Sequence, residues 1–260
     1  MTTTITVSNH KGGVAKTVTA WMLARHLRTR HTVLLIDMDP RASLSKLSGA
    51  VSHNGANINH VLGGANQPSA SLRQAAVLGD HDIEIVPSDM GLANTAYGLQ
   101  QRMFDRHTAL AQAILYTGRQ WDYIIVDSPP SADVLAINAL APADLVIIPS
   151  QPEPHSIDAV PETLSLVAQT ARAMHKDPAP HMVVATMCES HTNQHEAGIY
   201  LLSKDHGCRV FIPKRKGMDA DVQLFDAYEA LAHHVEDLFE DIGPYPFLPP
   251  IIARTSEVVL

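Results

Sequence analysis

The segment KGGVAKT, residues 11–17, restricts the fold of this chain more than any other. It lies between a short apolar run at residues 5–7 and a helical pattern. A loop of small residues at a helix N-terminus binds phosphate, because backbone N–H groups close around the oxygens and a lysine adds a full charge. Lys16 supplies that charge, and the Thr17 hydroxyl suits Mg²⁺. The sequence therefore predicts a phosphate-binding loop between a strand and a helix.

The loop departs from the usual pattern G-x-x-x-x-G-K-[ST] at its outer glycine positions, which are His10 and Ala15. A second lysine, Lys11, stands at the start of the loop. Since Lys16 already serves the phosphates of its own chain, we predict that Lys11 reaches a nucleotide bound by a second subunit. At Ala15 the backbone angles decide whether the methyl group crowds the phosphate or fits.

Short apolar runs alternate with helical patterns along the chain. Most of these runs are continuous, as in strands that are covered on both faces. The alternation predicts an α/β fold, a doubly wound and mostly parallel sheet with helices on both faces. The predicted strands are residues 4–8, 32–37, 83–86, 123–127, 145–149, 182–186 and 209–212.

The pattern also predicts the limits of the domain. We expect one domain over residues 1–242, with a loop-rich stretch at 50–80. Prolines exclude a continuing helix in the tail at residues 243–260. Met90 and Met103 are expected in the core. The predicted helices are residues 16–29, 89–117, 132–141, 156–175, 192–206 and 219–240.

Three aspartates follow apolar runs. VLLIDMDP places Asp37 and Asp39 after one predicted strand, and YIIVDSPP places Asp127 after another. Ligands of such sheets bind at the carboxyl ends of the strands, where the phosphate loop also lies. Carboxylates at these positions can hold Mg²⁺ through water or orient an attacking water molecule.

Composition narrows the class of protein. The net charge is −8, which excludes a uniformly basic nucleic-acid binder but permits a local basic patch. Two cysteines, Cys188 and Cys208, do not form a disulfide framework, so a reduced cytosolic setting is expected. We read no signal peptide and no apolar run of about 20 residues that would span a membrane.

Taken together, these motifs resemble a known family. KGGVAKT, VLLIDMDPRASLS and WDYIIVDSPPS, with the segments VPSDMGLA, LAINALAPADLVIIPSQPE, TMCESHTN and VFIPK, cover roughly residues 3–240. The sequence resembles the deviant Walker A class of P-loop NTPases, the ParA/MinD superfamily, and is closest to its ParA/Soj branch. The resemblance implies an ATPase that uses ATP and Mg²⁺ and holds two subunits together in an ATP sandwich.

The resemblance also implies roles for single residues. Lys16 contacts the β- and γ-phosphates, Lys11 crosses the dimer interface, and Asp39 positions the hydrolytic water. Thr17 binds Mg²⁺, supported through water by Asp37 and Asp127. Glu153 matches a residue that touches the partner's nucleotide, and Met187 and Pro213 lie where the family packs the adenine. The implied nucleotide-binding set is Lys11, Gly12, Gly13, Val14, Ala15, Lys16, Thr17, Val18, Glu153, Met187 and Pro213.

The function implied is that of a partition or positioning ATPase. It would bind DNA non-specifically in the ATP state, hydrolyse ATP slowly until a ParB-like or adaptor protein stimulates it, and distribute a plasmid, a chromosome or a protein assembly such as carboxysomes. It would be cytoplasmic and associated with the nucleoid in the ATP state. The candidate DNA contacts are Lys204, Arg209, Lys214, Arg215 and Lys216.

Two departures and two alternatives stay open. Arg41 replaces the family's usual glutamine, and Lys214 replaces a common arginine. One alternative is a MinD-like membrane-associated regulator, but the tail PFLPPIIARTSEVVL lacks the amphipathic helix it needs, so no membrane partner is expected. The other is a metabolic ATP-dependent enzyme of the same fold, which would not need Lys11. With about ten residues before the loop, no helix-turn-helix and no site-specific operator binding are expected.

Overall fold

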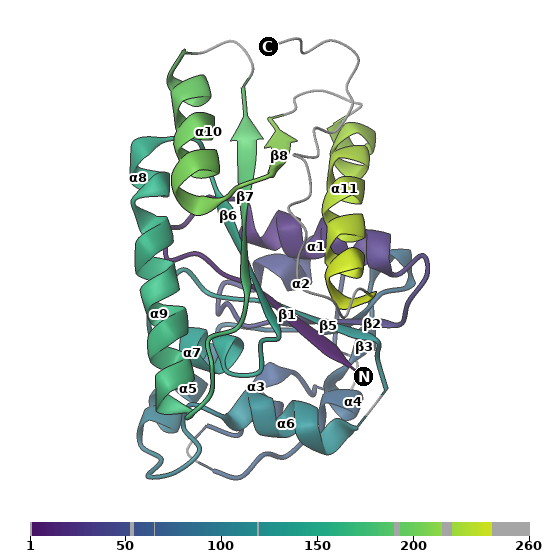
Figure 1. Cartoon of the computed structure of the whole chain (residues 1–260). Coiled ribbons are helices and arrows are strands. Elements are labelled where there is room, and N and C mark those ends of the chain that lie inside the picture. The colour runs from purple at the N-terminus through teal and green to yellow at the C-terminus, as the bar shows by residue number, and fades with distance from the viewer. Residues whose placement is uncertain are drawn as a thin grey trace.

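An eight-stranded sheet runs through the middle of the molecule (Figure 1), in the order β3-β4-β2-β5-β1-β6-β7-β8. The computed structural model describes residues 2–52, 55–64, 66–118, 120–189, 193–214 and 220–240, with the backbone alone at 220–225 and 240. Every strand pair is parallel except β3 with β4. The strands are β1 (Thr3–Val7), β2 (Val33–Asp37), β3 (Val77–Leu78), β4 (Glu84–Val86), β5 (Tyr123–Asp127), β6 (Leu145–Ser150), β7 (His181–Cys188) and β8 (Val210–Pro213).

Helices cover both faces of the sheet, so the predicted doubly wound α/β fold is confirmed (Figure 1). Helices α1, α2 and α11 share one face, and most of the others share the opposite face. The helices are α1 (Lys16–Leu27), α2 (Ser43–Leu47), α3 (Ile58–Leu62), α4 (Leu72–Ala75), α5 (Leu92–Gln100), α6 (Ala109–Thr117), α7 (Val134–Leu140), α8 (Pro154–Ile157), α9 (Ala159–Ala173), α10 (Asn193–His206) and α11 (Ala220–Glu240).

Burial on both faces explains why the strands are continuous apolar runs. In β6, Leu145 and Ile147 join the core under α1 and α11, whereas Val146 and Ile148 join the core under α9 and α10. Successive side chains of a strand point to opposite faces, so a strand between two helical layers needs an apolar residue at every position. The central strand β1 is buried in the same way, and it carries the phosphate loop at its carboxyl end.

One predicted helix is divided in the structure, and two methionines that were expected in the core are exposed. The predicted helix at 89–117 is divided into α5 and α6. Between them Asp105 has φ 57°, and the Arg102 guanidinium donates to the carbonyls of Leu62 and Asn66. Met103 in this anchored turn is 88% exposed. Met90, which lies just before α5, is 81% exposed, so the expectation that both methionines lie in the core was wrong.

The stretch at 50–80, expected to be loop-rich, contains α3, α4 and the short strand β3. Both helices begin with capping boxes, one from Asn57 to His60 and one from Ser71 to Gln74. Two predicted features, Arg215 with Lys216 and the tail at 243–260, lie outside the described residues. No helix within the described ranges has both the length and the apolarity to cross a membrane.

Candidate functional site

The phosphate loop joins β1 to α1 at the carboxyl edge of the sheet. Gly13 has φ 79°, and Ala15, which caps α1, has φ 65° and ψ 28°. Both residues are therefore in the left-handed region, which glycine adopts without strain and alanine at a cost of about 1 kcal/mol. The loop therefore keeps a backbone conformation typical of glycine, although Ala15 adds a methyl group to it.

The Lys16 ammonium lies folded over the loop. Its Nζ donates to the carbonyl oxygen of Lys11 at 2.7 Å, and the residue is buried. Burial lowers the pKa of Lys16 to about 8, while the negative charges of Asp127 and Asp39 act in the opposite direction. A desolvated ammonium held against a loop carbonyl is well placed for phosphate oxygens, which would restore the interactions it lost with water.

Thr17 and Asp127 form the candidate metal site. The Thr17 hydroxyl donates to Asp127 Oδ2 at 2.8 Å, and Asp127 is fully buried. Burial raises the pKa of Asp127 to about 8, and repulsion from Asp37, its register partner across β2 and β5, adds to this. Asp127 Oδ1 has no hydrogen-bond partner among the described residues.

A buried oxygen without a partner fits a water molecule of hydrated Mg²⁺. The structure describes no group of three or more His, Cys, Asp or Glu residues arranged to hold a metal ion in its mapped ranges. These residues therefore fit a magnesium ion held mainly by Thr17, phosphate oxygens and water rather than by a protein cage.

Asp37 fixes the backbone at the carboxyl edge of the sheet. Its Oδ1 accepts from the backbone N–H of Asp39 at 3.0 Å, and its Oδ2 accepts from both the N–H and the hydroxyl of Ser45 at 2.9 and 2.7 Å. Burial raises the pKa of Asp37 even so. With both oxygens occupied by protein donors, Asp37 holds the chain after β2 in place beside Asp127. Its predicted support of the metal through water stays a prediction.

Asp39 is bound by Arg41. The Arg41 Nη2 donates to Asp39 Oδ2 at 2.7 Å, and the Arg41 Nε lies 3.2 and 3.1 Å from the two carboxylate oxygens. Hydrogen bonding and the charge of Asp39 raise the pKa of the guanidinium. Sequence reasoning identified Arg41 as a departure from the family but did not find this ion pair.

The second lysine of the loop is tied to its own chain. Lys11 Nζ donates to the hydroxyl of the buried Ser156 in α8 at 2.8 Å, and the Lys11 N–H donates to Asn9 Oδ1 at 2.8 Å. Ser156 was not a predicted site residue. Its distance of 145 residues along the chain gives no sequence signal for the contact. The predicted role of Lys11 toward a second subunit stays a prediction.

The candidate adenine residues lie at the same sheet edge. Met187, with φ 55°, is near the end of β7, and Pro213 ends β8 beside Cys188. The Gln151 side-chain N–H groups contact both the carbonyl oxygen of Gly13, at 3.1 Å, and the Met187 sulfur, at 2.8 Å. Gln151, which sequence reasoning missed, thus links the phosphate loop to the candidate adenine side.

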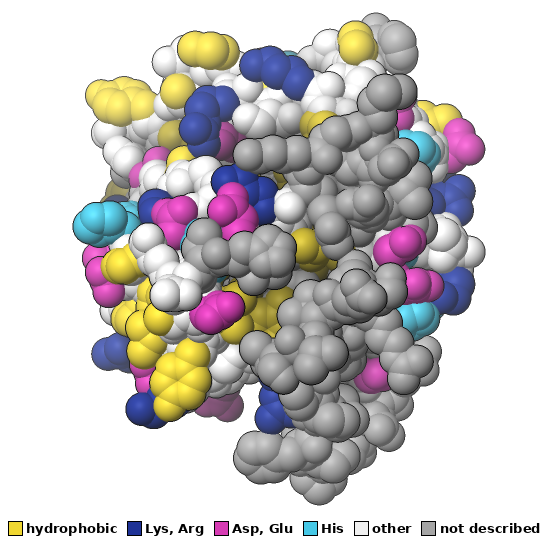
Figure 2. All heavy atoms as spheres, turned by 90° about the horizontal axis from the view of Figure 1, so that it is seen from above, with side chains coloured by type: hydrophobic (Ala, Val, Ile, Leu, Met, Phe, Trp, Pro, Cys, Tyr) yellow, Lys and Arg dark blue, Asp and Glu magenta, His cyan; other side chains and the backbone are white. Residues whose placement is uncertain are grey.

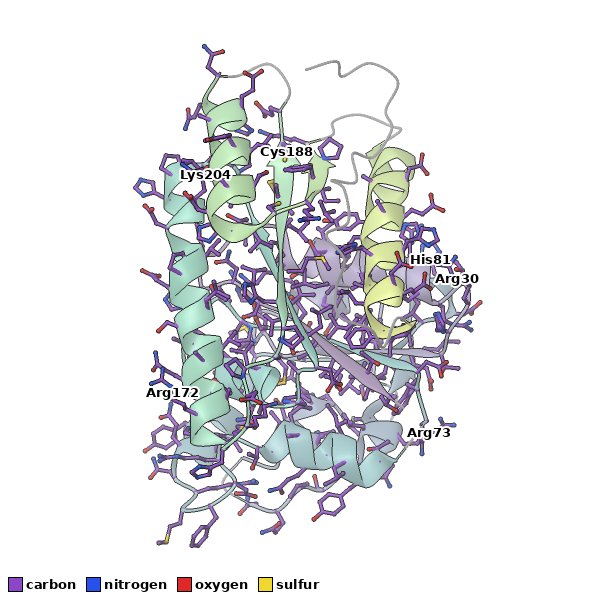
Figure 3. The ribbon with its side chains drawn as sticks, viewed as in Figure 1. Arg30, Arg73, His81, Arg172, Cys188 and Lys204 are labelled. Carbon is purple, nitrogen blue, oxygen red and sulfur yellow. The ribbon has the colours of Figure 1, made fainter. Side chains whose placement is uncertain are left out.

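The carboxyl-edge face carries charges of both signs. Figure 2, seen from above, shows Lys and Arg side chains beside Asp and Glu. Lys214 Nζ lies 2.5 Å from Glu189 Oε1, with Glu153 also interacting electrostatically. Lys204 lies over the Tyr200 ring on α10, as Figure 3 locates it, 5.8 Å from the ring centroid. Within this chain, the charge of Lys214 is thus balanced by a carboxylate at the candidate DNA surface.

The proton on Asp127 leads to a testable pH dependence. Its pKa is raised from 3.8 to about 8, so between these values the folded chain holds a proton that the unfolded chain has lost. The free energy of unfolding therefore falls as pH rises toward 8, by up to about 1.4 kcal/mol per pH unit. In Asp127→Asn this part of the slope should disappear, as measured by urea unfolding from pH 5 to 8 without nucleotide.

A matched control is Asp205→Asn, a change at an exposed carboxylate of α10, which should keep the slope of the original chain. Lys16 acts in a different window, since its lowered pKa raises stability only as pH increases above about 8. Equal slopes for the original chain and Asp127→Asn would show that Asp127 is not protonated in the folded state.

Comparison with known proteins places this edge in context. Residues 2–178 match the family described as AAA domain. The chromosome partitioning protein ParA of Myxococcus xanthus is 30% identical over 190 residues, which cover 73% of this chain and 66% of that protein. The sporulation initiation inhibitor protein Soj of Bacillus subtilis is 28% identical, over 73% of this chain and 74% of that protein. The chain spans about two thirds of the length of the first of these relatives.

Solved structures share the fold. The cobyrinic acid a,c-diamide synthase of Mycobacterium smegmatis, with a bound ATP analog and magnesium, superposes with a TM-score of 0.83 at 25% identity. The superposition covers 97% of this chain and 100% of that one. The likeness therefore extends over nearly the whole chain.

Proposed function

Because the chain belongs to the AAA domain family, among the ParA/Soj-type ATPases of the ParA/MinD superfamily, we propose that it is a nucleotide-switched positioning ATPase. The observation that carries the proposal is the grouping of Lys16, Thr17, Asp127 and Asp39 around one phosphate loop at the carboxyl edge of the sheet. ATP and Mg²⁺ are the cofactors that suit this grouping, and the synthase of the same fold was crystallised with both kinds of ligand.

Each residue has a role in the proposed hydrolysis. Lys16 binds the β- and γ-phosphate oxygens, and Thr17 and Asp127 hold the metal and its waters. Bound Mg²⁺ would neutralise charge that develops on the phosphates. Asp39 orients the attacking water, so that ADP and inorganic phosphate leave. Positioning and charge stabilisation carry most of the rate in this kind of reaction.

The proposed switch is dimerisation. In the ATP state Lys11 leaves Ser156 and reaches the nucleotide of a second copy, so that two chains enclose two ATP molecules. The dimer would bind DNA phosphates without reading sequence and would release them after hydrolysis, which a ParB-like or adaptor protein stimulates. The chain would then act in the cytoplasm, on the nucleoid, moving a DNA molecule or a protein assembly.

Dimerisation is tested by light scattering with Mg²⁺ and a slowly hydrolysed ATP analogue. The original chain is expected to double in mass, and Lys11→Ala to stay monomeric because the charge that crosses the interface is gone. Lys176→Ala, which removes an exposed lysine outside the site, is the matched control and should dimerise. A monomeric original chain with bound analogue would reject the switch and favour an ATP-dependent metabolic enzyme.

The same samples test the DNA step. The original chain should bind random-sequence DNA only with the ATP analogue, with an affinity that falls steeply as salt rises. Lys11→Ala should lose this binding together with dimerisation. Binding that is equally strong without nucleotide would disconnect DNA from the switch.

A further inference from the structure

We propose that Arg41 is a positioning residue that restrains the Asp39 carboxylate and thereby slows hydrolysis of bound ATP. The inference rests on the proposed function, since it assigns regulation to the same site. It concerns Arg41, which directly follows the segment Asp37-Met38-Asp39-Pro40.

Both oxygens of Asp39 are engaged by Arg41. Oδ1 accepts from the Arg41 backbone N–H at 2.9 Å, and the guanidinium spans Oδ1 and Oδ2 through Nε and Nη2. The Asp39 side chain is only 7% exposed, whereas that of Arg41 is 64% exposed. The more exposed guanidinium thus occupies both carboxylate oxygens, which a water molecule would otherwise contact.

The backbone holds this arrangement from both sides. The Asp39 N–H donates to Asp37 Oδ1, and the Asp39 carbonyl accepts from the Ser88 hydroxyl at 2.9 Å and the Ala42 N–H at 2.9 Å. The Arg41 carbonyl in turn accepts from Lys46 Nζ at 2.8 Å. With the turn fixed by these bonds, release of the Asp39 carboxylate would require the guanidinium to move away from it.

The guanidinium also lies near the phosphate-binding groups. It interacts electrostatically with Asp127 and with Lys16. A fork of parallel donors binds a carboxylate more specifically than a glutamine amide, which is neutral, or a lysine, which is a point charge. An arginine at this position therefore competes with water for Asp39 more strongly than a glutamine or a lysine would.

The experiment measures steady-state ATP hydrolysis with Mg²⁺. Arg41→Gln is expected to raise kcat about two- to fivefold, as for loss of a partly exposed ion pair, with KM changed less than twofold. Arg41→Lys keeps the charge without the fork and should give a kcat between those of the original chain and Arg41→Gln. A merely structural role would not change kcat and KM in this separate way.

Arg73→Gln is the matched control, because Arg73 lies on α4 at the far end of the molecule in Figure 3, and its kcat should be unchanged. Fluorescent-nucleotide binding is measured for every variant. If the original chain hydrolyses ATP and Arg41→Gln has an equal or lower kcat, the restraint is refuted while the proposed function stands. If neither hydrolyses bound ATP, both fail. A kcat of Arg41→Lys outside the range of the other two also overturns the proposal.

Discussion

Replacing Lys16 with alanine is expected to abolish ATP binding, with a loss of affinity of at least about 100-fold, or roughly 2.7 kcal/mol. Lys16 is the buried cation of the loop, and its ammonium already lacks water and lies against the Lys11 carbonyl. Hydrogen bonds from a charged donor to phosphate contribute about 1.5–3 kcal/mol each. Isothermal titration with Mg²⁺ and a slowly hydrolysed ATP analogue measures the change.

The fold should survive this change. Desolvation is the main influence on the Lys16 pKa, so the buried ammonium is a cost to the nucleotide-free chain that alanine removes. Circular dichroism and thermal unfolding check this point. Lys176→Ala, at an exposed position, should bind the analogue like the original chain. Unchanged affinity in Lys16→Ala would mean that the loop does not hold the phosphates.

Replacing Asp39 with alanine is expected to reduce kcat for ATP hydrolysis by about 10²- to 10³-fold, while ATP still binds. Asp39 is the carboxylate nearest to solvent among the three at this edge, and Asp37 and Asp127 are more completely buried. Without it no side chain orients the water, so the ATP dimer should accumulate. Phosphate release and light scattering with ATP measure the two effects.

Asp205→Ala, at an exposed position of α10, provides the control for loss of a carboxylate and should turn over normally. The decisive observation is the mass of Asp39→Ala with ATP. A monomer that binds ATP without hydrolysing it would contradict the sandwich, even if the loss of turnover were as large as expected. A dimer that hydrolyses ATP at the original rate would remove Asp39 from the reaction.

The central strands could be predicted from sequence because they are buried on both faces. The run VLLID has no polar residue before Asp37, and the structure buries all five of its residues. The short helices could not be predicted in this way, since four or five residues are too few to show a helical period. The S-x-x-Q pattern of Ser71 and Gln74 is a readable signal for α4, because the capping box forms in the structure.

Part of the candidate site could be predicted from the sequence, and part of it could not. Asp37 and Asp127 end neighbouring parallel strands and the phosphate loop follows a third, so the parallel sheet alone brings them together. The hydrogen-bond partners of the side chains could not be predicted in this way. The Arg41 guanidinium is largely exposed, and the turn that fixes Asp39 places that carboxylate against it. The break between α5 and α6 likewise depends on a contact of Arg102 with a distant loop.

If Lys11 contacts a second copy as proposed, its hydrogen bond to Ser156 would make dimerisation depend on the local concentration of the chain. The population of a hydrogen bond within one molecule does not depend on how many chains are nearby. A contact with another copy, in contrast, becomes more populated as the local concentration of chains rises. Lys11 would therefore stay bonded to Ser156 at a low local concentration of chains and would contact a second copy at a high one. The proposed ATPase would then respond to its own local concentration as well as to nucleotide.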